Sequence, residues 1–277
     1  CPAMNTGMYL NPITQENIVK LKEHGVTVMP AATGFLACGT SGPGRLPEPA
    51  DIVSFMENFF AKSEGDLRGL RILVTTAGTR EPIDPVRFVG NRSSGKMGYA
   101  IADQAAKRGA EVLLVTGPSA LAIPANIKAV KVETTREMLD AVMDAYPNVD
   151  IVIKAAAVAD YRPRDVADQK IKKKNDDAMT VVMDKNPDIL KTLGQQKQHQ
   201  VLIGFAAETQ NLIENATEKV NKKNLDMIVA NDVSAAGAGF NTDTNIVKFL
   251  YADGRLESLD IMPKTDVANR ILDEALL

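Results

Sequence analysis

Residues 71–78 read RILVTTAG, and this apolar run followed by small residues is typical of a strand buried on both faces of a sheet. Residues 96–109, KMGYAIADQAAKRG, follow with the pattern of a helix that ends at Gly109. The same alternation predicts further strands at 111–117, 127–133, 150–160, 179–183, 201–208 and 226–232, with helices at 134–146, 187–193 and 211–223. Apolar strands separated by helices predict an α/β fold with a doubly wound, mostly parallel, Rossmann-like sheet.

Two local patterns refine this prediction. Thr134 and Glu137 form a capping box, which places the start of a helix there. Asp253 and Gly254 lie at the centre of residues 246–261 and predict a hairpin, so an antiparallel ribbon is added to the sheet. Because ligands of such sheets bind beyond the carboxyl ends of the parallel strands, we expect the functional site at that edge.

The beginning of the chain has a different character. It contains predicted helices at 14–24 and 49–60, a short apolar run at 26–30 and a Gly-rich loop at 34–45. With one weak strand it is too small to be expected to fold alone, so we interpret residues 1–63 as the end of a larger domain rather than a helical appendage. Residues 64–69 are then a linker and residues 70–277 a second domain. Because the chain begins with Cys1, we expect an upstream segment.

The composition limits the possible functions. The chain is 45% hydrophobic and 24% charged, which is typical of a globular protein. Its formal net charge of -3 argues against a general nucleic-acid binder, so any anion site must be a local cluster. No apolar run reaches the roughly 18 residues that a membrane span requires. The two cysteines, Cys1 and Cys38, cannot form a disulfide framework, which favours a reducing cytoplasm.

The segment GNRSSGKMG at 90–98 nearly matches the phosphate-binding loop G-x-x-x-x-G-K-[ST]. Met97 stands where a hydroxyl would bind Mg²⁺, and residues 79–89 separate the segment from the preceding strand, so this interpretation fails. The dinucleotide fingerprint G-x-G-x-x-G is also missing after that strand, and the sequence contains no Tyr-x-x-x-Lys pair. These absences oppose a nicotinamide-dependent Rossmann oxidoreductase, which is one alternative function.

Polar residues around this segment still predict an anion site. Ser93 and Ser94 precede the predicted helix, so either can cap it, and the free N–H groups at a helix N-terminus attract an anion. Arg87, Arg92 and Lys96 add positive charge nearby. The alternative is a capped helix with solvated basic neighbours.

A longer stretch gives these residues a more specific meaning. TTAGTREPIDPVRFVGNRSSGKMG at 75–98 resembles the signature of phosphopantothenate–cysteine ligases. Further matches follow in the family's order: AAAVADYRP at 155–163, KIKK at 170–173, KNPDIL at 185–190, GFAAET at 204–209, KVNKKNLDMIVAND at 219–232 and GFNTDTN at 239–245. The resemblance covers residues 70–277. It is closest to the bacterial bifunctional coenzyme A biosynthesis proteins, in which this ligase follows a flavin-dependent decarboxylase.

The beginning of the chain resembles that decarboxylase. PAMN at 2–5 is similar to its substrate-binding motif, and GFLACGTSGPGR at 34–45 is similar to its substrate clamp. The resemblance implies that Cys38 protonates the reaction intermediate and that Asn5 helps to bind the substrate carboxylate, with FMN as cofactor in the intact protein. The family's catalytic histidine and most FMN contacts lie upstream of this segment, so we expect no decarboxylation by this chain alone.

For the second domain the resemblance implies a two-step ligation. The carboxylate of 4′-phosphopantothenate attacks CTP to form an acyl-cytidylate, and L-cysteine then displaces CMP. Asn91 is implied to handle the acyl-cytidylate and Lys170 to act in its formation. Arg87 is suited to a two-pronged contact with a carboxylate or phosphate. From the residues alone, Asn91 could equally be a turn residue, and Lys170 with Lys172 a solvated run of charge.

The resemblance also implies binding residues and partners. Those for CTP are Asp160, Lys170, Pro187, Asp188, Ile189, Leu190, Phe205, Lys219 and Lys223. Those for phosphopantothenate are Arg87, Asn91, Ser93, Ser94, Ala156 and Ala157, and Asp243 and Asn245 are further candidates for this substrate or a cation. No His/Cys metal spacing occurs, so Mg²⁺ is expected to arrive with the nucleotide. A homodimer through the ligase domain and a higher assembly through the decarboxylase domain are implied as well.

A non-enzymatic nucleotide-sensing module is the second alternative function. Asn91 together with Lys170 opposes it, since a sensor need not keep both. The choice of CTP over other nucleotides rests on the resemblance and not on residue spacing.

Overall fold

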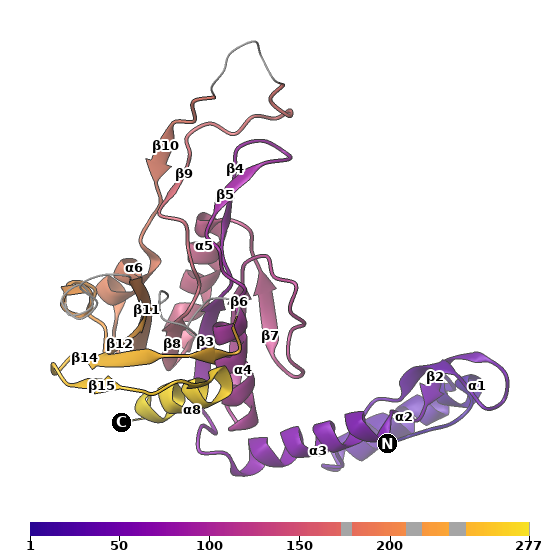
Figure 1. Ribbon diagram of the computed structural model, residues 1–277. Helices are drawn as coiled ribbons and strands as arrows, with labels where there is room; N and C mark the ends of the chain where they lie inside the picture. The colour runs from indigo at the N-terminus through magenta and orange to yellow at the C-terminus, as the bar shows by residue number, and fades with distance from the viewer. Residues whose placement is uncertain (173–178, 209–217, 233–241, 277) are drawn as a thin grey trace. The chain divides into compact units, whose positions relative to one another are not determined.

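The computed structural model describes residues 1–172, 179–208, 218–232 and 242–276, which form one unit at Cys1–Ala61 and another at Lys62–Leu277 (Figure 1). The helix predicted at 211–223 is seen at residues 218–222, and its first part lies outside the described residues. Over the described ranges, no helix is both long and apolar enough to cross a membrane.

The second unit is built on an eight-stranded sheet with the order β15-β14-β12-β11-β8-β3-β6-β7. Its strands in chain order are β3 (Arg71–Thr76), β6 (Glu111–Thr116), β7 (Lys128–Lys131), β8 (Ile151–Lys154), β11 (Val201–Glu208), β12 (Met227–Asp232), β14 (Val247–Tyr251) and β15 (Leu256–Ser258). The strands from β7 to β12 are all parallel, whereas β14 and β15 are antiparallel additions beside β12.

This strand order confirms the predicted doubly wound sheet with an antiparallel ribbon. The chain starts at β3, moves through β6 to β7, and then returns to build β8, β11 and β12 on the other side of β3. The order therefore reverses between β3 and β8, and a sheet of this kind binds its ligands beside that switch point.

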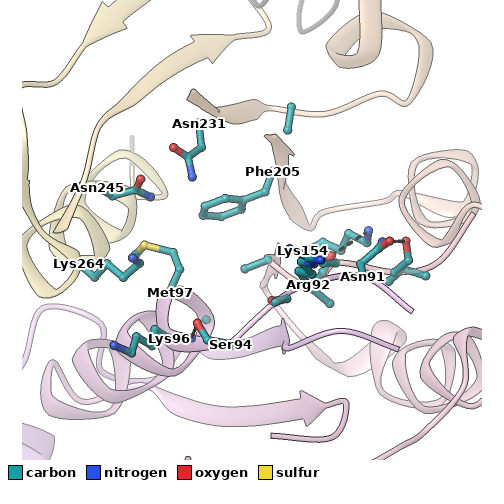
Figure 2. Close-up of a pocket in the computed structure, with 18 of the residues that line it drawn as sticks. Asn91, Arg92, Ser94, Lys96, Met97, Lys154, Phe205, Asn231, Asn245 and Lys264 are labelled. Atoms are coloured by element: carbon teal, nitrogen blue, oxygen red, sulfur yellow. Dashed lines mark hydrogen bonds between the residues drawn. The ribbon is translucent and has the colours of Figure 1, made fainter. Parts of the chain in front are cut away.

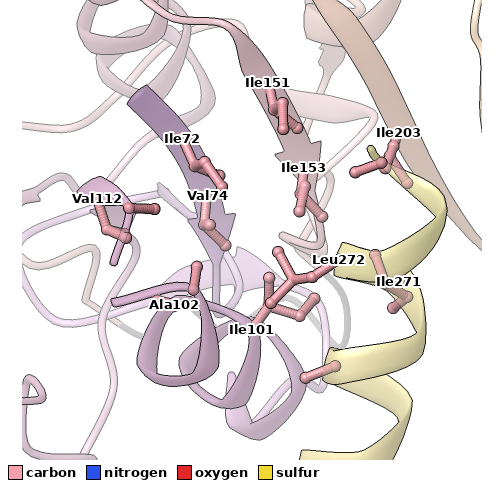
Figure 3. Close-up of a cluster of buried hydrophobic side chains, with 14 of the residues drawn as sticks. Ile72, Val74, Ile101, Ala102, Val112, Ile151, Ile153, Ile203, Ile271 and Leu272 are labelled. Carbon is pink, nitrogen blue, oxygen red and sulfur yellow. The ribbon is translucent and has the colours of Figure 1, made fainter. Parts of the chain in front are cut away.

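Helices cover both faces of the sheet. Helices α4 (Lys96–Lys107) and α8 (Lys264–Glu274) pack on one face. Helices α5 (Thr135–Ala145) and α6 (Ile189–Gln196) pack on the other, together with the 3₁₀ turn η1 (Tyr146–Asn148). Successive residues of β3 serve the two cores, because strand side chains alternate between faces. Figure 3 shows Ile72 and Val74 on the side of α4 and α8, while Leu73 belongs to the opposite core.

Two short antiparallel ribbons stand outside this sheet (Figure 1). One pairs β4 (Arg80–Pro82) with β5 (Phe88–Gly90), and the other pairs β9 (Tyr161–Pro163) with β10 (Met183–Lys185). A third short pair joins β13 (Thr244–Asn245) to β16 (Met262–Pro263). The strand predicted at 179–183 was therefore wrong in place, since only its last residue enters a strand and that strand does not join the main sheet.

The strand predicted at 150–160 was too long. β8 ends at Lys154 because the following residues bond to the loop after β3 instead of to a neighbouring strand end. The Ala157 N–H donates to the Ala77 carbonyl at 2.8 Å, and the Thr79 N–H donates to the Ala157 carbonyl at 3.4 Å. This bend carries the segment toward the carboxyl edge of the sheet, where ligands are expected.

The start of α4 confirms the predicted serine cap only in part. Gly95 is the N-cap residue, in the left-handed conformation with φ of 81°. Ser94, one residue earlier, still contacts the first turn, because its Oγ accepts from the Lys96 N–H at 3.4 Å. Gly98 lets the first turn approach β3, because a Cβ at that position would lie 2.3 Å from Thr76 Oγ1. By contrast, the predicted capping box of α5 is confirmed, with Thr134 Oγ1 accepting from the Glu137 N–H at 3.2 Å.

The first unit contains α1 (Thr6–Tyr9), α2 (Pro12–Glu23), β1 (Ala32–Phe35), β2 (Ser41–Arg45) and α3 (Pro49–Glu64). The two predicted helices are confirmed. The Gly-rich segment at 34–45, predicted as a loop, instead contributes to a β1–β2 hairpin, and the apolar run at 26–30 forms no strand. Leu36 is the one buried hydrophobic residue among the described side chains of this unit, so they form no core of their own.

Candidate functional site

A pocket of about 500 Å³ lies at the carboxyl edge of the parallel strands, where the strand order reverses. It is named here the sheet-edge pocket. The loop before α4, the segment after β8, and the ends of β11 and β12 all contribute to it. Its lining residues are Asn91, Arg92, Ser93, Ser94, Gly95, Lys96, Met97, Gly98, Lys154, Ala155, Ala156, Ala157, Val158, Asp160, Phe205, Ala206, Lys219, Asn231, Asn245 and Lys264.

The pocket has two ends that differ in their residues, and Figure 2 shows both. Asn91 and Lys154 lie at one end, named the Lys154 end. Asn245 and Lys264 lie at the other, named the Lys264 end. The ring of Phe205 stands between them, so a ligand that fills the pocket would contact polar groups at each end and an apolar surface in the middle.

The Asn91 side chain is tied to the segment that follows β8. Its Nδ2 donates to the Val158 carbonyl at 3.0 Å. Gly78 permits this approach, because a Cβ there would lie 2.9 Å from the Asn91 carbonyl oxygen. Asn91 is exposed, and its side-chain oxygen can only accept hydrogen bonds. The hydrogen bond from Nδ2 to Val158 fixes the direction in which this oxygen points.

A buried polar network holds the segment that leads to Asp160. The Glu81 carboxylate, 1% exposed, accepts from the Thr135 N–H at 2.9 Å and from its hydroxyl at 2.7 Å. Asn186 donates to the Ala159 carbonyl at 2.9 Å, and the Ala159 N–H donates to Thr79 Oγ1 at 3.0 Å. Because buried polar groups are costly when unpaired, this network favours one conformation of the backbone beside Asp160. Sequence reasoning missed it, since its members are far apart in the chain.

Lys154 is a second residue that the sequence analysis missed. It ends β8, and its Nζ donates to the Ala156 carbonyl at 3.4 Å. Burial, together with the neighbouring charge of Lys223, lowers the pKa of Lys154 from 10.5 to about 8, and Asp188 and Asp160 oppose the shift. The signal in the sequence was a single lysine at the end of an otherwise apolar strand.

Nine of the residues implied for CTP, phosphopantothenate or a cation line the sheet-edge pocket. They are Asn91, Ser93, Ser94, Ala156, Ala157, Asp160, Phe205, Lys219 and Asn245. The others do not line it: Arg87, Lys170, Lys223, Asp243 and the residues from Pro187 to Leu190.

Lys223 and the start of α6 lie beside the sheet-edge pocket. They line a neighbouring depression, and Lys219 lines both. Asp188 is the N-cap of α6, accepting from the Lys191 N–H at 3.1 Å, and it pairs with Lys223 Nζ at 2.8 Å. Desolvation, the largest single effect, would raise the pKa of Asp188. The hydrogen bonds from Lys223 and the Lys191 N–H, together with the charges of Lys223 and Lys154, outweigh it and lower that pKa. A second depression, lined by Asp188, Lys219 and Lys223 among others, adjoins the Lys154 end through Lys219.

Arg87 makes its two-pronged contact with a protein carboxylate. Its Nε and one terminal nitrogen donate to Asp84 Oδ2 at 3.0 and 2.5 Å, and the Asp84 side chain is fully buried. The guanidinium holds the pKa of Asp84 well below its usual range. Arg87 also donates to the Ile171 carbonyl at 3.1 Å, and the Ile171 N–H donates to Asp84 at 3.1 Å. Arg87 therefore anchors the residue next to Lys170.

Comparison with known proteins identifies the family of this chain. Residues 67–276 match the family described as DNA/pantothenate metabolism flavoprotein C-terminal domain, and residues 1–61 match the family described as Flavoprotein. The coenzyme A biosynthesis bifunctional protein CoaBC of Bacillus subtilis is 47% identical over 275 residues, which are 99% of this chain and 68% of that protein. The chain belongs to the CoaBC family.

Other CoaBC proteins are similar to this chain to nearly the same extent. The one from Escherichia coli is 45% identical over 276 residues, again 99% of this chain and 68% of that protein. A crystal structure of the C-terminal domain of CoaBC is 49% identical, with a TM-score of 0.65 over 75% of this chain and 94% of that one. Residues 67–276 are thus the phosphopantothenate–cysteine ligase domain of the CoaBC family, and residues 1–61 are part of its flavoprotein domain.

In the flavoprotein part of this CoaBC homologue, the two residues implied by the resemblance lie together. Asn5 Nδ2 donates to Cys38 Sγ at 3.1 Å, and the Thr40 hydroxyl lies 3.3 Å from the same sulfur. Hydrogen bonds with Thr40, followed by that from Asn5, lower the pKa of the Cys38 thiol. The pair is exposed, so it is accessible to a substrate.

Across the part of the chain that the structure describes, no group of three or more His, Cys, Asp or Glu side chains could hold a metal ion.

Proposed function

We propose that the second unit catalyses CTP-dependent ligation of 4′-phosphopantothenate with L-cysteine, giving phosphopantothenoylcysteine, CMP and pyrophosphate in coenzyme A biosynthesis. The supporting observation is that Asn91, Asp160, Phe205 and Lys219 line one pocket at the switch point in a chain of the CoaBC family. A pocket with cations and neutral donors suits the meeting of two anionic reactants.

The reaction has two steps. In the first, a carboxylate oxygen of phosphopantothenate bonds to the α-phosphorus of CTP while the bond to pyrophosphate breaks. In the second, the amine of cysteine attacks the acyl carbon, the bond to CMP breaks, and the amine loses a proton. Negative charge gathers in both steps, so fixed donors and cations lower the barrier.

We assign Asn91 to the acyl-cytidylate, because it is a neutral amide at the edge of the pocket, held by the Val158 carbonyl. Lys170 is assigned to the first step, where its ammonium would offset charge on the departing pyrophosphate. The anchoring of Ile171 by Arg87 and Asp84 supports this, since it fixes where the Lys170 segment begins. Arg87 would act through this anchor as a positioning residue.

We assign the Lys154 end and the adjoining depression to CTP. Phe205 offers a ring face to the base or ribose, and Asp160 offers an acceptor to their donors. Lys219 and Lys223 supply positive charge for phosphates. The residues at the start of α6 also belong to this CTP subsite: Pro187, Asp188, Ile189 and Leu190.

The phosphopantothenate carboxylate would lie near Asn91. Ser93 and Ser94 provide hydroxyls on the loop before α4, and Ala156 and Ala157 leave room for backbone contacts with the substrate. Asn91 would then contact the acyl group formed in the first step.

Mg²⁺ is expected to bind mainly to the nucleotide phosphates, because the described residues include no cluster of ligands for it. Asp160 is the carboxylate in the pocket that could accept one of its coordinated waters. Mg²⁺ would supply charge neutralisation at the phosphates when bound.

The flavoprotein part is proposed to act in decarboxylation only within an intact protein. Residues 1–61 form one antiparallel hairpin and no parallel sheet that could hold an FMN phosphate at its strand ends, so they do not fit a complete flavin site. Their contribution would be Cys38 as proton donor and Asn5 as carboxylate ligand. The free thiols of Cys1 and Cys38 are consistent with a cytoplasmic enzyme.

We further propose that the ligase domain forms a homodimer, with higher assembly through the flavoprotein part. The β4–β5 and β9–β10 ribbons and their loops expose large apolar side chains that another subunit could cover: Val86, Phe88, Val89, Tyr161, Val166 and Val182. Light scattering should give the mass of a dimer for residues 62–277, and a monomer at all concentrations would contradict this.

A pyrophosphate-release assay with each of the four nucleotides tests the proposed function. We expect release with CTP only when phosphopantothenate is present, and product only when cysteine is added. Binding of CTP without release would indicate the nucleotide sensor, and reduction of a nicotinamide cofactor would indicate the oxidoreductase. Release that needs neither acid nor CTP would refute the ligation.

A further inference from the structure

The second step of the proposed reaction releases a proton, and no histidine is in place to accept it. Histidine is the side chain that most often accepts a proton in catalysis. The chain has two histidines, and neither lines the sheet-edge pocket. His199 lies 3.9 Å from Asp150, which directly precedes β8, so it stands at the opposite edge of the sheet. His24 belongs to the first unit. The proton acceptor is therefore another kind of side chain.

Lys154 lines the pocket and can lose its charge near neutral pH. Desolvation, together with the charge of Lys223, lowers the pKa of Lys154 from 10.5 to about 8. Asp188 and Asp160 oppose this shift, and Lys219 adds to it. A general base works best when its pKa is close to the working pH, since it is then both unprotonated and basic enough.

The position of this amine suits a proton transfer beside the acyl group. Lys154 is the last residue of β8, and its Nζ donates to the Ala156 carbonyl at 3.4 Å. Asn91, which is assigned to the acyl-cytidylate, donates to the Val158 carbonyl at 3.0 Å. These two carbonyls are two residues apart in one segment, so at most about 7 Å separates them. Figure 2 shows both side chains at the same end of the pocket.

The amine of Lys154 can take a substrate as a partner without giving up its present contact. Its bond to Ala156 is longer than a typical N–H···O bond, and it makes no other hydrogen bond or ion pair within the described residues. A neutral lysine amine has two N–H donors and one lone pair. It can therefore keep donating to Ala156 while the lone pair accepts a proton from an incoming amine.

Two other lysines of the pocket are less suited to this role. The Nζ of Lys96 lies 2.7 Å from Asp243 Oδ1, so its ammonium is already engaged by a carboxylate. Lys264 lies at the other end of the pocket, beyond the ring of Phe205, where it donates to the Thr244 carbonyl at 3.1 Å.

We propose that Lys154 is the general base of the second step, which accepts the proton that the cysteine amine loses. This inference rests on the proposed function. The nitrogen of the neutral cysteine amine forms a bond to the acyl carbon. The bond from that carbon to the phosphate oxygen of CMP breaks, and its electron pair leaves with CMP. The proton moves from the cysteine nitrogen to Lys154 Nζ, and the resulting ammonium later gives it to water.

The charge beside Lys154 changes between the two steps in the direction that this role requires. The triphosphate of bound CTP favours the ammonium form, which offsets negative charge in the first step. Departure of pyrophosphate removes that negative charge, and the charges of Lys223 and Lys219 then favour loss of the proton. The amine is thus returned to its neutral form before the cysteine amine attacks.

The pH dependence of the two steps distinguishes a base from a phosphate ligand. Pyrophosphate release from CTP and phosphopantothenate reports the first step. Rapid-quench measurement of product from synthetic acyl-cytidylate and cysteine reports the second step alone. Lys154→Arg keeps a positive charge but cannot accept a proton, because arginine stays protonated in proteins. It should therefore support pyrophosphate release within about threefold of wild type and slow the second step about a hundredfold at pH 9.

The comparison at low pH makes the test specific. At pH 6 Lys154 of wild type is itself protonated, so the second-step rates of wild type and Lys154→Arg should lie within about threefold of each other. The ratio of the two rates cancels the titration of cysteine itself. Lys128→Met is the control, since the Lys128 side chain is 78% exposed, and it should change neither step at either pH.

A smaller variant covers the case in which arginine does not fit. Lys154→Ala should slow the second step to a similar extent at pH 9. Trimethylamine, which accepts a proton but cannot form an amide, should then raise its rate at least about tenfold. A second step that is as fast in Lys154→Ala as in wild type at pH 9 would overturn the inference.

The use of supplied acyl-cytidylate separates this inference from the proposed function. If wild type converts it with the expected dependence on pH but releases no pyrophosphate from CTP, Lys154 stands as the base and the proposed first step fails. If pyrophosphate is released as proposed but the ratio of wild type to Lys154→Arg stays constant from pH 6 to pH 9, the proposed reaction stands and Lys154 is not its base.

Discussion

Replacing Lys154 with Met should stabilise the folded protein at neutral pH. Burial at the end of β8 lowers the pKa of Lys154 from 10.5 to about 8, and Lys223 adds to this shift. Because the folded pKa lies below the unfolded one, the unfolded chain binds more protons between pH 8 and 10.5, and the free energy of unfolding should rise with pH across that window. The destabilisation caused by the charged amine is fully present below pH 8.

The pKa difference sets the magnitude. It is 10.5 minus 8, or about 2.5 units, and each unit corresponds to about 1.36 kcal/mol, so the upper bound is roughly 3.4 kcal/mol. Lys154 keeps partial exposure to the pocket, which reduces the effect. We therefore expect Lys154→Met to raise the free energy of unfolding by about 1.5–3 kcal/mol at pH 7, and by well under about 1 kcal/mol at pH 10.

Urea unfolding at pH 7 and pH 10 measures this difference. Lys128→Met is the control, because the Lys128 side chain is 78% exposed and its charge is solvated in both states. Its free energy of unfolding relative to wild type should not change between the two pH values. The reasoning is refuted if wild type and Lys154→Met show the same change in stability from pH 7 to pH 10.

CTP binding should raise the pKa of Lys154 toward its usual value if CTP occupies the Lys154 end of the pocket. Phosphate charge favours the ammonium form, so CTP binding near pH 8 should take up as much as about half a proton at Lys154. Calorimetry in two buffers of different ionisation enthalpy measures the uptake. Equal uptake by wild type and Lys154→Met would show that the phosphates do not reach this amine.

Three other substitutions test the site and its support. Asn91→Asp should release pyrophosphate but accumulate acyl-cytidylate, and normal turnover would refute its assigned role. Lys170→Gln should lose pyrophosphate release, so an unchanged rate would contradict its part in the first step. Gly98→Ala places a Cβ 2.3 Å from Thr76 Oγ1 and should cost about 1–3 kcal/mol, lowering Tm by at least ~2 °C. An unchanged Tm would show that α4 shifts away from β3 without strain.

The strand ends explain why part of the site could be predicted. Asn91, Asp160 and Phe205 are distant in sequence. Asn91 precedes a helix, Asp160 ends a predicted parallel strand and Phe205 lies in the second half of another, so all three are near the same edge of the sheet. Parallel strands bring their carboxyl ends together, so the sequence pattern placed these residues near one another. The family resemblance then indicated which reaction such a site would serve.

Arg87 shows what that approach could not foresee. The sequence pointed to a substrate anion for its guanidinium, whereas the structure pairs it with the buried Asp84 and with the backbone beside Lys170. No spacing rule distinguishes a protein carboxylate from a ligand carboxylate. Gly95 is a similar case, because a left-handed glycine takes the N-cap position and Ser94 accepts from the Lys96 N–H from one residue earlier.

The sequence by itself determined the alternation of strands and helices, the antiparallel ribbon and the edge at which ligands bind, because these follow from local periodicity and turn residues. The tertiary structure alone decided which polar groups lose their water. The lowered pKa of Lys154, the buried unpaired Asn231 Oδ1 and the buried Glu81 network all depend on neighbours that are far apart in the chain. Desolvation is set by everything that surrounds a group in space, so no local stretch of sequence can encode it.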